Sequence, residues 1–282
     1  MKTLIIQEAG RHEANRNYRE SLCMQRALKL LGKHADVWGL NHENFNETPE
    51  FNSYDLIINL ENYDETGWLP DLSLYNKPVK FLWSIDAHCR GMEPYMKIFH
   101  AGKYDKILQA IKDFVNEHSV WFPSAYDHTL MKPLGIEKKY KLGFCGSVLN
   151  RGGLLDLLTE KYNLKKDIWV LGDDMVRAVN SYKIHFNMNI ANDINFRSFE
   201  TIGMGTVLLT NRNPQYYELG FIDGINCLMY ETPQELCSKI ETFSKNDKVL
   251  DMIGKMGLEL ARKHTYLERA KKIINLYKSA EK

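Results

Sequence analysis

Short, continuous apolar runs alternate with longer helical stretches through the first half of the chain. Runs of this kind are typical of strands buried on both faces, and their alternation with helices predicts a parallel sheet that is covered on both sides. The first half is therefore predicted to form one Rossmann-like domain. We predict a helix at residues 13–31 and strands at residues 3–7, 35–40, 54–60, 79–85, 104–108 and 119–122.

The same rhythm begins again after Lys138. We therefore predict an α/β protein with two Rossmann-like domains, residues 1–138 and 139–282, whose parallel sheets face a central cleft. The connection is expected near residues 123–139, around Pro123 and Pro133. In the second half we predict strands at 140–145, 167–171, 183–188, 207–209 and 227–230, and helices at 154–162, 234–243, 248–263 and 266–278.

The composition is that of an ordinary globular protein, with 44% hydrophobic and 26% charged residues in 282. A net charge of +1 gives no electrostatic footprint for duplex nucleic acid or an anionic membrane. The five cysteines include no C-x-x-C pair, which argues against a disulfide framework or a zinc site and favours a reducing, cytoplasmic compartment. No apolar run is long enough to span a bilayer, and the N-terminal run is too short for a signal peptide.

The segment from Asp193 to Asn211 carries most of the functional argument. An acid, an arginine and a glutamate lead into a short helix, and a Gly-x-Gly break and a buried strand follow. In α/β proteins ligands bind where strand ends meet helix starts. Glu200 could hold the two hydroxyls of a ribose, and Arg197 could hold phosphate oxygens. The alternatives are an exposed glutamate in a first helical turn and a surface ion pair.

The pattern D-x-N-x-R-x-F-E, a break of small residues and L-L-T-N resembles the C-terminal signature of CgeB-type, spore-maturation-like glycosyltransferases. These enzymes belong among the GT-B glycosyltransferases. The resemblance covers roughly the last hundred residues. It implies a second domain that binds a nucleotide sugar, and a terminal helix that crosses back onto the first domain; packing of that helix on its own domain stays open. It continues through Glu218, Leu219, Asp223, Gly224, Asn226, Glu235, Leu236, His264, Thr265, Tyr266 and Arg269.

The resemblance assigns the ribose to Glu200 and places Asn195 among the donor contacts. Many retaining GT-B enzymes carry two glutamates separated by seven residues. That spacing falls on Asn192 here, and the acid Asp193 lies one residue closer to Glu200. Asp193 is therefore a candidate catalytic residue whose contact with the sugar is in doubt, and retention or inversion at the sugar is left open.

The loop after the strand at 140–145 is the second candidate contact with the donor. Glycines allow backbone N–H groups to approach phosphates, and a helix start favours anions. Gly146, Ser147 and Arg151 would hold the diphosphate, as the resemblance also implies; an ordinary strand-to-helix turn is the alternative. The absence of G-x-G-x-x-G and of G-x-x-x-x-G-K-[ST] argues against a dinucleotide cofactor or a P-loop.

Asp86 and His88 follow the strand at 79–85 and could act as general base on an acceptor hydroxyl; satisfied polar residues at a strand end are the alternative. Gly10, Arg11, His12, Arg16 and Arg19 could line the acceptor side, or form a solvated helix start. Asp173-Asp174 reads as an exposed loop rather than a metal site, so no metal is expected, and positive side chains and helix starts would replace it. Gly203-Met204-Gly205 is interpreted as a break of small residues that permits tight packing of the helix against the following strand.

These features predict a metal-independent glycosyltransferase that moves a hexose or pentose from a nucleotide diphosphate sugar to an acceptor hydroxyl. The nucleotide sugar is the donor substrate, and no other cofactor is expected. The acceptor could be a glycan, a small molecule, a protein or a modified nucleic acid. Three alternatives stay open: a two-lobed protein that binds a small ligand without chemistry, a nucleotide-sugar epimerase, and a transferase acting on modified DNA bases.

Overall fold

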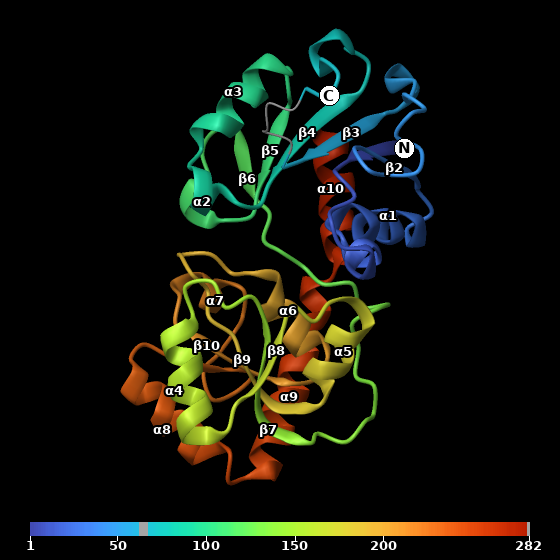
Figure 1. The fold of residues 1–282 in the computed structure, drawn as a ribbon. Coiled ribbons are helices and arrows are strands. Elements are labelled where there is room, and N and C mark those ends of the chain that lie inside the picture. Colours follow the sequence, from blue (N-terminus) through green and yellow to red (C-terminus); the bar gives the residue numbers. More distant parts are fainter. Residues whose placement is uncertain (62–66, 281–282) are drawn as a thin grey trace. The chain divides into compact units, whose positions relative to one another are not determined.

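The computed structural model describes residues 1–61 and 67–280. The chain divides into two compact units, Met1–Ser124 with Tyr266–Lys282, and Ala125–Thr265. Each unit contains one sheet whose neighbouring strands are all parallel. The predicted α/β fold with two parallel sheets is confirmed (Figure 1).

The first unit contains a six-stranded sheet in the order β2-β1-β3-β4-β5-β6. Helices α1 and α10 pack against each other. Helix α3 packs its apolar residues into a core with apolar residues of β1, β3, β4 and β5. The strands are β1 (Lys2–Ile6), β2 (His34–Trp38), β3 (Leu56–Leu60), β4 (Val79–Ser84), β5 (Lys106–Gln109) and β6 (Ser119–Trp121). The α-helices are α1 (Glu20–Leu30), α2 (Ala87–Arg90), α3 (Glu93–Ala101) and α10 (Tyr266–Ala280), and the 3-10 helices are η1 (Glu13–Tyr18), η2 (Phe51–Ser53), η3 (Leu72–Leu74) and η4 (Lys112–Phe114).

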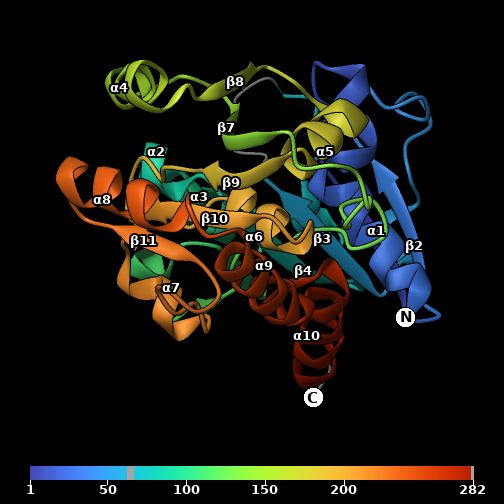
Figure 2. The ribbon, with the colours of Figure 1, turned by 90° about the horizontal axis from the view of Figure 1, so that it is seen from below.

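The second unit contains a five-stranded sheet in the order β11-β10-β9-β7-β8, which can be followed across Figure 2. Figure 1 shows α4 and α8 on one face of this sheet and α5 and α6 on the other. The strands are β7 (Tyr140–Gly146), β8 (Lys165–Ile168), β9 (Tyr182–Phe186), β10 (Val207–Asn211) and β11 (Leu228–Tyr230). The helices are α4 (Gly152–Tyr162), α5 (Gly172–Asn180), α6 (Phe196–Gly203), α7 (Pro214–Glu218), α8 (Pro233–Phe243), α9 (Asp247–Ala261) and the 3-10 helix η5 (Arg262–His264).

The division between the units falls after Ser124, whereas the sequence placed it at residue 138. The segment that follows is fastened to the second unit, because Tyr126 N–H donates to the carbonyl of His264 at 3.2 Å. The terminal helix α10 is counted with the first unit. Within that unit the buried Arg269 donates through Nε to the carbonyl of Pro123, 2.7 Å away. This bond holds α10 to the segment that follows β6.

Several local expectations differ from the structure. The helix expected at residues 13–31 is interrupted at Arg19, whose extended backbone separates η1 from α1. The expected loop at residues 86–88 contains the first residues of α2. The strand expected at residues 167–171 ends at Ile168, because Trp169 has a left-handed backbone with a φ of 58°. Asp173 and Asp174 are exposed, but they lie in the first turn of α5 rather than in a loop.

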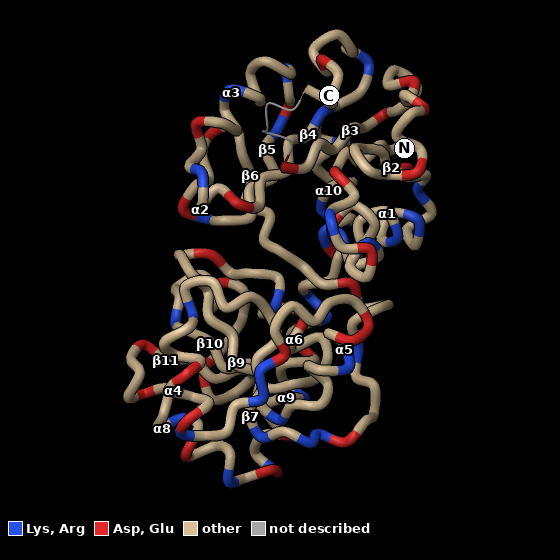
Figure 3. The backbone as a smooth tube through the Cα atoms, viewed as in Figure 1, with Lys and Arg blue, Asp and Glu red and all other residues tan. Residues whose placement is uncertain are grey.

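Charged residues of both signs are interspersed along both units, as Figure 3 shows. This distribution agrees with the net charge of +1. None of the described helices is both long and apolar enough to cross a membrane.

Candidate functional site

The order of strands in the second sheet reverses at β7. The next strand along the chain, β8, lies on one side of β7, and the later strands β9, β10 and β11 lie on the other, so the switch point falls between β7 and β9. In an open parallel sheet this switch point, at the carboxyl ends of the strands, is where ligands bind. The loop after β7 leads into α4, and the loop after β9 leads into α6. The donor-site candidates of the second half therefore lie on these two loops or on α6, beside the switch point.

Arg151 organises the loop between β7 and α4. Its Nε donates to the carbonyl of Met188 at 2.9 Å, and its Nη1 donates to the carbonyls of Ser147 and Leu149, each at 3.2 Å. The Nη2 group makes no hydrogen bond to any part of the chain that the structure describes. Burial lowers the pKa of Arg151, and the charge of Asp193 opposes that shift, so Arg151 and Asp193 lie within electrostatic reach of each other.

The start of α4 lacks a side-chain cap. Its N-cap residue Arg151 makes no side-chain capping bond, so within the described residues the first backbone N–H groups of the helix have no side-chain acceptor. A Cβ added at Gly152 or Gly153 would meet no atom within 4 Å, so local packing does not require glycine at either position. A helix start with small residues and a nearby arginine is suited to phosphate oxygens.

Gly146, the last residue of β7, and Ser147, the first residue of the loop, lie at the same end of the strand. The carbonyl of Gly146 accepts a hydrogen bond from the backbone N–H of Trp169 at 3.4 Å, which ties the loop to the end of β8. The hydroxyl of Ser147 accepts a bond from the N–H of Leu149 at 3.3 Å. Both residues therefore shape the loop that precedes α4, and their contact with a ligand stays a prediction.

Arg197 and Glu200 form an ion pair on α6, with 2.6 Å between Nη1 and Oε2. Their side chains are 19% and 12% exposed, so this is not the surface ion pair that was the alternative. Glu200 is the fifth residue of α6 and lies beyond its first turn. The structure thus brings the two residues together, with one oxygen of Glu200 already fixed by Arg197.

His185, which was not predicted as a site residue, holds the helix that carries this pair. Its Nε2 accepts a bond from the backbone N–H of Cys145 at 3.2 Å, so the ring proton lies on Nδ1 and is donated to Thr201 Oγ1 at 2.6 Å. Thr201 donates in turn to the carbonyl of Arg197 at 2.6 Å. Burial, together with the charge of Arg197, holds the pKa of His185 well below its usual value, so the ring stays neutral and fastens α6 to β7 and β9.

Buried amides fix the loop between β9 and α6. Asn195 donates through its backbone N–H to Asn189 Oδ1 at 3.1 Å and through Nδ2 to Asn187 Oδ1 at 3.3 Å. Asp193 is 6% exposed, and its Oδ1 accepts the N–H of Ala191 at 3.2 Å. Asn195 and Asp193 are therefore structural parts of this loop, and the roles expected of them toward the donor stay predictions.

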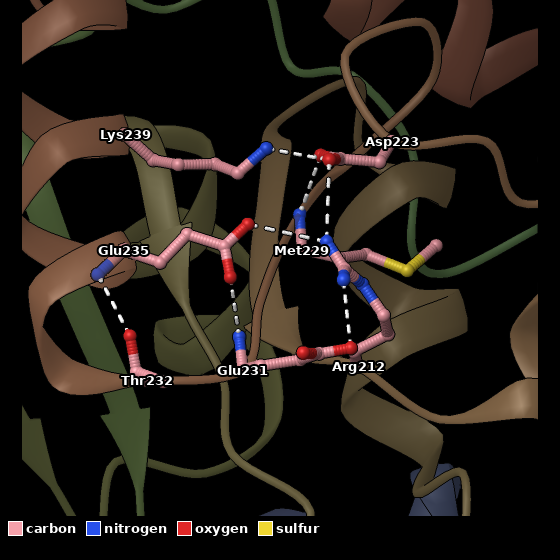
Figure 4. A network of polar contacts seen from close by, with 7 residues as sticks. All are labelled: Arg212, Asp223, Met229, Glu231, Thr232, Glu235 and Lys239. Atoms are coloured by element: carbon pink, nitrogen blue, oxygen red, sulfur yellow. Dashed lines mark hydrogen bonds and ion pairs between the residues drawn. The ribbon is translucent and has the colours of Figure 1, made fainter.

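A second polar network lies at the carboxyl ends of β10 and β11 (Figure 4). Arg212 contacts Glu231 through Nη1 at 2.7 Å and Glu235 through Nη2 at 3.1 Å. Asp223 accepts the N–H of Met229 at 2.9 Å. Each carboxylate of this network binds a cation or a backbone N–H. The signature residues Asp223 and Glu235 therefore have a structural role in holding these loops.

The acceptor-side candidates lie in the first unit. Asp86 is exposed at the start of α2, and His88 is half-buried two residues later. Nδ1 of His88 is buried and has no partner among the described residues. Arg11 and His12 are exposed, and Arg16 and Arg19 are half-buried. Arg19 lies across Gly10, 3.5 Å from the position of an added Cβ.

Glu61 is the residue of the first unit that sequence reasoning missed. It follows β3 in a left-handed backbone with a φ of 55°. Its Oε1 accepts the backbone N–H groups of Ile85 and Asp86, the latter at 3.0 Å, and Oε2 lies 2.9 Å from the hydroxyl of Tyr95. Burial and the charge of Asp86 raise the pKa of Glu61 from 4.5 to about 7, although its hydrogen bonds oppose that shift. Glu61 therefore fixes the turn that carries Asp86.

Over residues 1–61 and 67–280, no three His, Cys, Asp or Glu side chains form a group that could hold a metal ion. The metal-free reaction stays a prediction, because a substrate diphosphate can itself supply ligands to a metal.

The two parallel sheets and the site at a switch point define the class of protein: this is the GT-B fold of glycosyltransferases. The chain belongs to the glycosyl transferase-like family, whose model matches residues 130–275, more than half of the sequence. No curated protein sequence matches the chain.

Solved structures of similar fold extend over the whole chain. A glycosyltransferase from Rickettsia africae ESF-5 has a TM-score of 0.67 at 11% identity and covers 100% of this chain and 98% of its own. HepE of Anabaena, solved in complex with UDP and glucose, has a TM-score of 0.68 at 12% identity, with 99% and 100% covered. The DNA modifying enzyme β-glucosyltransferase, solved with and without uridine diphosphoglucose, has a TM-score of 0.69 at 13% identity, with 100% of both chains covered. At these identities the likeness shows the fold alone.

Proposed function

We propose that this chain is a glycosyltransferase that moves a sugar from a nucleoside diphosphate sugar to an acceptor hydroxyl without a metal ion. The observation that carries the proposal is the uncapped start of α4 beside Arg151, on one side of the switch point whose other side bears Arg197 and Glu200. The signature in residues 193–211 further favours the CgeB-type branch of the family.

The diphosphate of the donor would bind at the start of α4. Backbone N–H groups of the first turn and Nη2 of Arg151 would donate to its oxygens. When the bond between the sugar carbon and the phosphate oxygen breaks, negative charge grows on the departing diphosphate. Groups that are already oriented toward that charge lower the barrier, because they do not have to reorganise during the reaction.

The ribose of the donor would bind Glu200. A carboxylate accepts hydrogen bonds from a diol, each worth about 1.5–3 kcal/mol. The ion pair with Arg197 holds the carboxylate in one orientation and keeps a positive charge near the leaving group. Arg197 would therefore serve the donor both directly, through its charge, and indirectly, through Glu200.

The acceptor would be served by residues of the first unit. In an inverting transfer, a base removes the proton of the acceptor hydroxyl while its oxygen forms the new bond to the sugar carbon. Asp86 is the exposed candidate, and His88 is the second. The proposed division of labour assigns donor binding to the second unit and proton removal to the first.

The test is calorimetric titration with UDP, GDP, ADP and TDP, in EDTA and in Mg²⁺. UDP comes first, because HepE was solved with UDP. We expect one nucleotide to bind equally well in both buffers, with affinity reduced about 10- to 150-fold in Glu200→Ala and in Arg151→Ala, the equivalent of about 1.5–3 kcal/mol.

Arg262→Ala is the matched control, because this arginine lies in the same unit, is 71% exposed and forms a surface ion pair with Glu259. It should bind the nucleotide as the wild type does. Binding that requires Mg²⁺ would refute the metal-free reaction, and binding that survives both site substitutions would refute the site.

A further inference from the structure

Trp169 is the most exposed of the tryptophans that the structure describes. Its accessible fraction is 64%. Its backbone is left-handed, with a φ of 58°. A bulky residue in this conformation is an outlier that costs about 1–3 kcal/mol, and such strain persists mainly where function requires it. Exposure and strain therefore both indicate that this indole is kept for contact with a ligand.

The position of Trp169 connects it to the proposed donor site. Ile168 and Gly146 are paired across β8 and β7, and the N–H of Trp169 donates to the carbonyl of Gly146 at 3.4 Å. The chain continues from Gly146 into the loop that Arg151 organises. Figure 2 shows β7 and β8 side by side at the end of the sheet that leads to α4.

Three further exposed apolar side chains belong to the two segments that this hydrogen bond connects. Val148 and Leu149, in the loop before α4, are 41% and 62% exposed, and Ile168 is 41% exposed. Ligand sites typically combine exposed apolar side chains with a few polar groups. We call Val148, Leu149, Ile168 and Trp169 the apolar edge.

We propose that Trp169 stacks on the flat ring of the donor's nucleoside, and that the apolar edge adds affinity for any donor that carries such a ring. The inference rests on the proposed function, because the start of α4 would fix the diphosphate and thereby place the nucleoside nearby. Stacking on an aromatic side chain accepts any base, since every base has a π-face. The energy of binding would thus be divided between the diphosphate and the ring.

The experiment compares UDP with inorganic pyrophosphate, which has the diphosphate but no ring, and with uridine, which has the ring but no diphosphate. In Trp169→Ala we expect the affinity for UDP to fall about 5- to 150-fold, which corresponds to the range measured for single stacking contacts. The affinity for pyrophosphate should stay unchanged. Trp169→Phe should restore most of the affinity for UDP.

Trp169→Gly separates binding from folding. Glycine adopts the left-handed backbone without strain, so this variant should melt at the same temperature as the wild type or higher, and still bind UDP as weakly as Trp169→Ala. The control is Tyr217→Ala, which removes an aromatic ring that is 48% exposed elsewhere in the same unit. It should bind UDP normally.

Fluorescence gives an independent readout. Of the five tryptophans, only Trp169 belongs to the second unit. We expect UDP to quench the emission of the wild type and pyrophosphate to leave it unchanged, with no UDP response in Trp169→Phe.

Two results would overturn the inference while leaving the proposed function intact. One is normal affinity for UDP in Trp169→Ala. The other is an equal loss of affinity for UDP and pyrophosphate, which would mean that Trp169 only shapes the loop. Failure of the wild type to bind UDP, the other nucleotides and pyrophosphate would instead reject the proposed function, and this inference with it.

Discussion

Replacement of Glu61 by glutamine tests whether this carboxylic acid is held protonated in the native state. Glutamine has the same shape, so its Oε1 can still accept the N–H groups of Ile85 and Asp86. Its amide can donate to the hydroxyl of Tyr95, which lies 2.9 Å from Oε2 in the wild type. Glu61→Gln therefore keeps the contacts and removes the titration.

The direction of the pH effect follows from the raised pKa. Burial first, and then the charge of Asp86, raise the pKa of Glu61 from 4.5 to about 7. The native state thus binds this proton more tightly than the unfolded chain does, and the free energy of unfolding falls as the pH rises from 4.5 to about 7. At 1.36 kcal/mol for each pKa unit, the loss amounts to about 3 kcal/mol at most.

The assay is urea unfolding at pH 5, 6, 7 and 8, followed by tryptophan fluorescence, which reports mainly on the first unit because four of the five tryptophans lie there. Wild type and Glu61→Gln should be similar in stability at pH 5. The variant should become the more stable protein by up to about 3 kcal/mol at pH 8. Glu93→Gln is the control, because Lys97 lowers the pKa of that exposed acid, so no gain with rising pH is expected. A constant difference between wild type and Glu61→Gln from pH 5 to 8 would refute the reasoning.

Two matched pairs of substitutions in the second unit test the packing under the donor site. The buried hydroxyl of Tyr216 forms hydrogen bonds with three other polar side chains, so Tyr216→Phe should lower the free energy of unfolding in urea by about 1–3 kcal/mol. The control is Tyr217→Phe, at a side chain that is 48% exposed, which should change that free energy by less than about 0.5 kcal/mol. Equal effects would contradict the network. An added Cβ at Gly203 would lie 2.3 Å from the ring of Tyr126, so Gly203→Ala should lose about 1–3 kcal/mol. Gly153→Ala should keep or gain stability, because its methyl group meets no atom within 4 Å. It should weaken pyrophosphate binding if the anion binds against this turn as proposed; unchanged binding would argue against an anion site at α4.

Most strands were predictable because they contain short runs of apolar residues; β8, with the sequence Lys-Lys-Asp-Ile, is the exception, and the strand expected at 167–171 overlaps only its end. The eleven strands of the described residues overlap the ranges that the sequence indicated, and the helices between most of them account for their parallel pairing. Helices α2, α3, α5 and α7 were not predicted. They are short, at four, nine, nine and five residues, and so repeat the helical period too few times to stand out in a sequence.

The candidate site was predictable only in part. The proximity of Arg197 and Glu200 follows from their spacing of three on a helix, which places them on one face. Glu61 and His185 could not be found in this way, because their partners come from distant parts of the chain. Glu61 meets the turn at residues 85–86, and His185 connects Cys145 with Thr201. Trp169 was read as part of a strand, because periodicity does not show the left-handed backbone that ends β8.

The residues that carry the resemblance also explain why the family was easier to predict than its substrates. Asn226 accepts the N–H of Ile222 at 2.8 Å and donates to the carbonyl of Gly220, and His264 contacts the carbonyl of Leu219 at 2.8 Å. Such residues preserve loop geometry, so a signature built from them indicates a scaffold. Two signature residues, Arg197 and Glu200 on α6, are themselves proposed to contact the donor. The other groups proposed to contact ligands lie on loops outside the signature, before α4, after β8 and around Asp86. Substitutions in those loops should therefore change the choice of substrate while the fold stays the same.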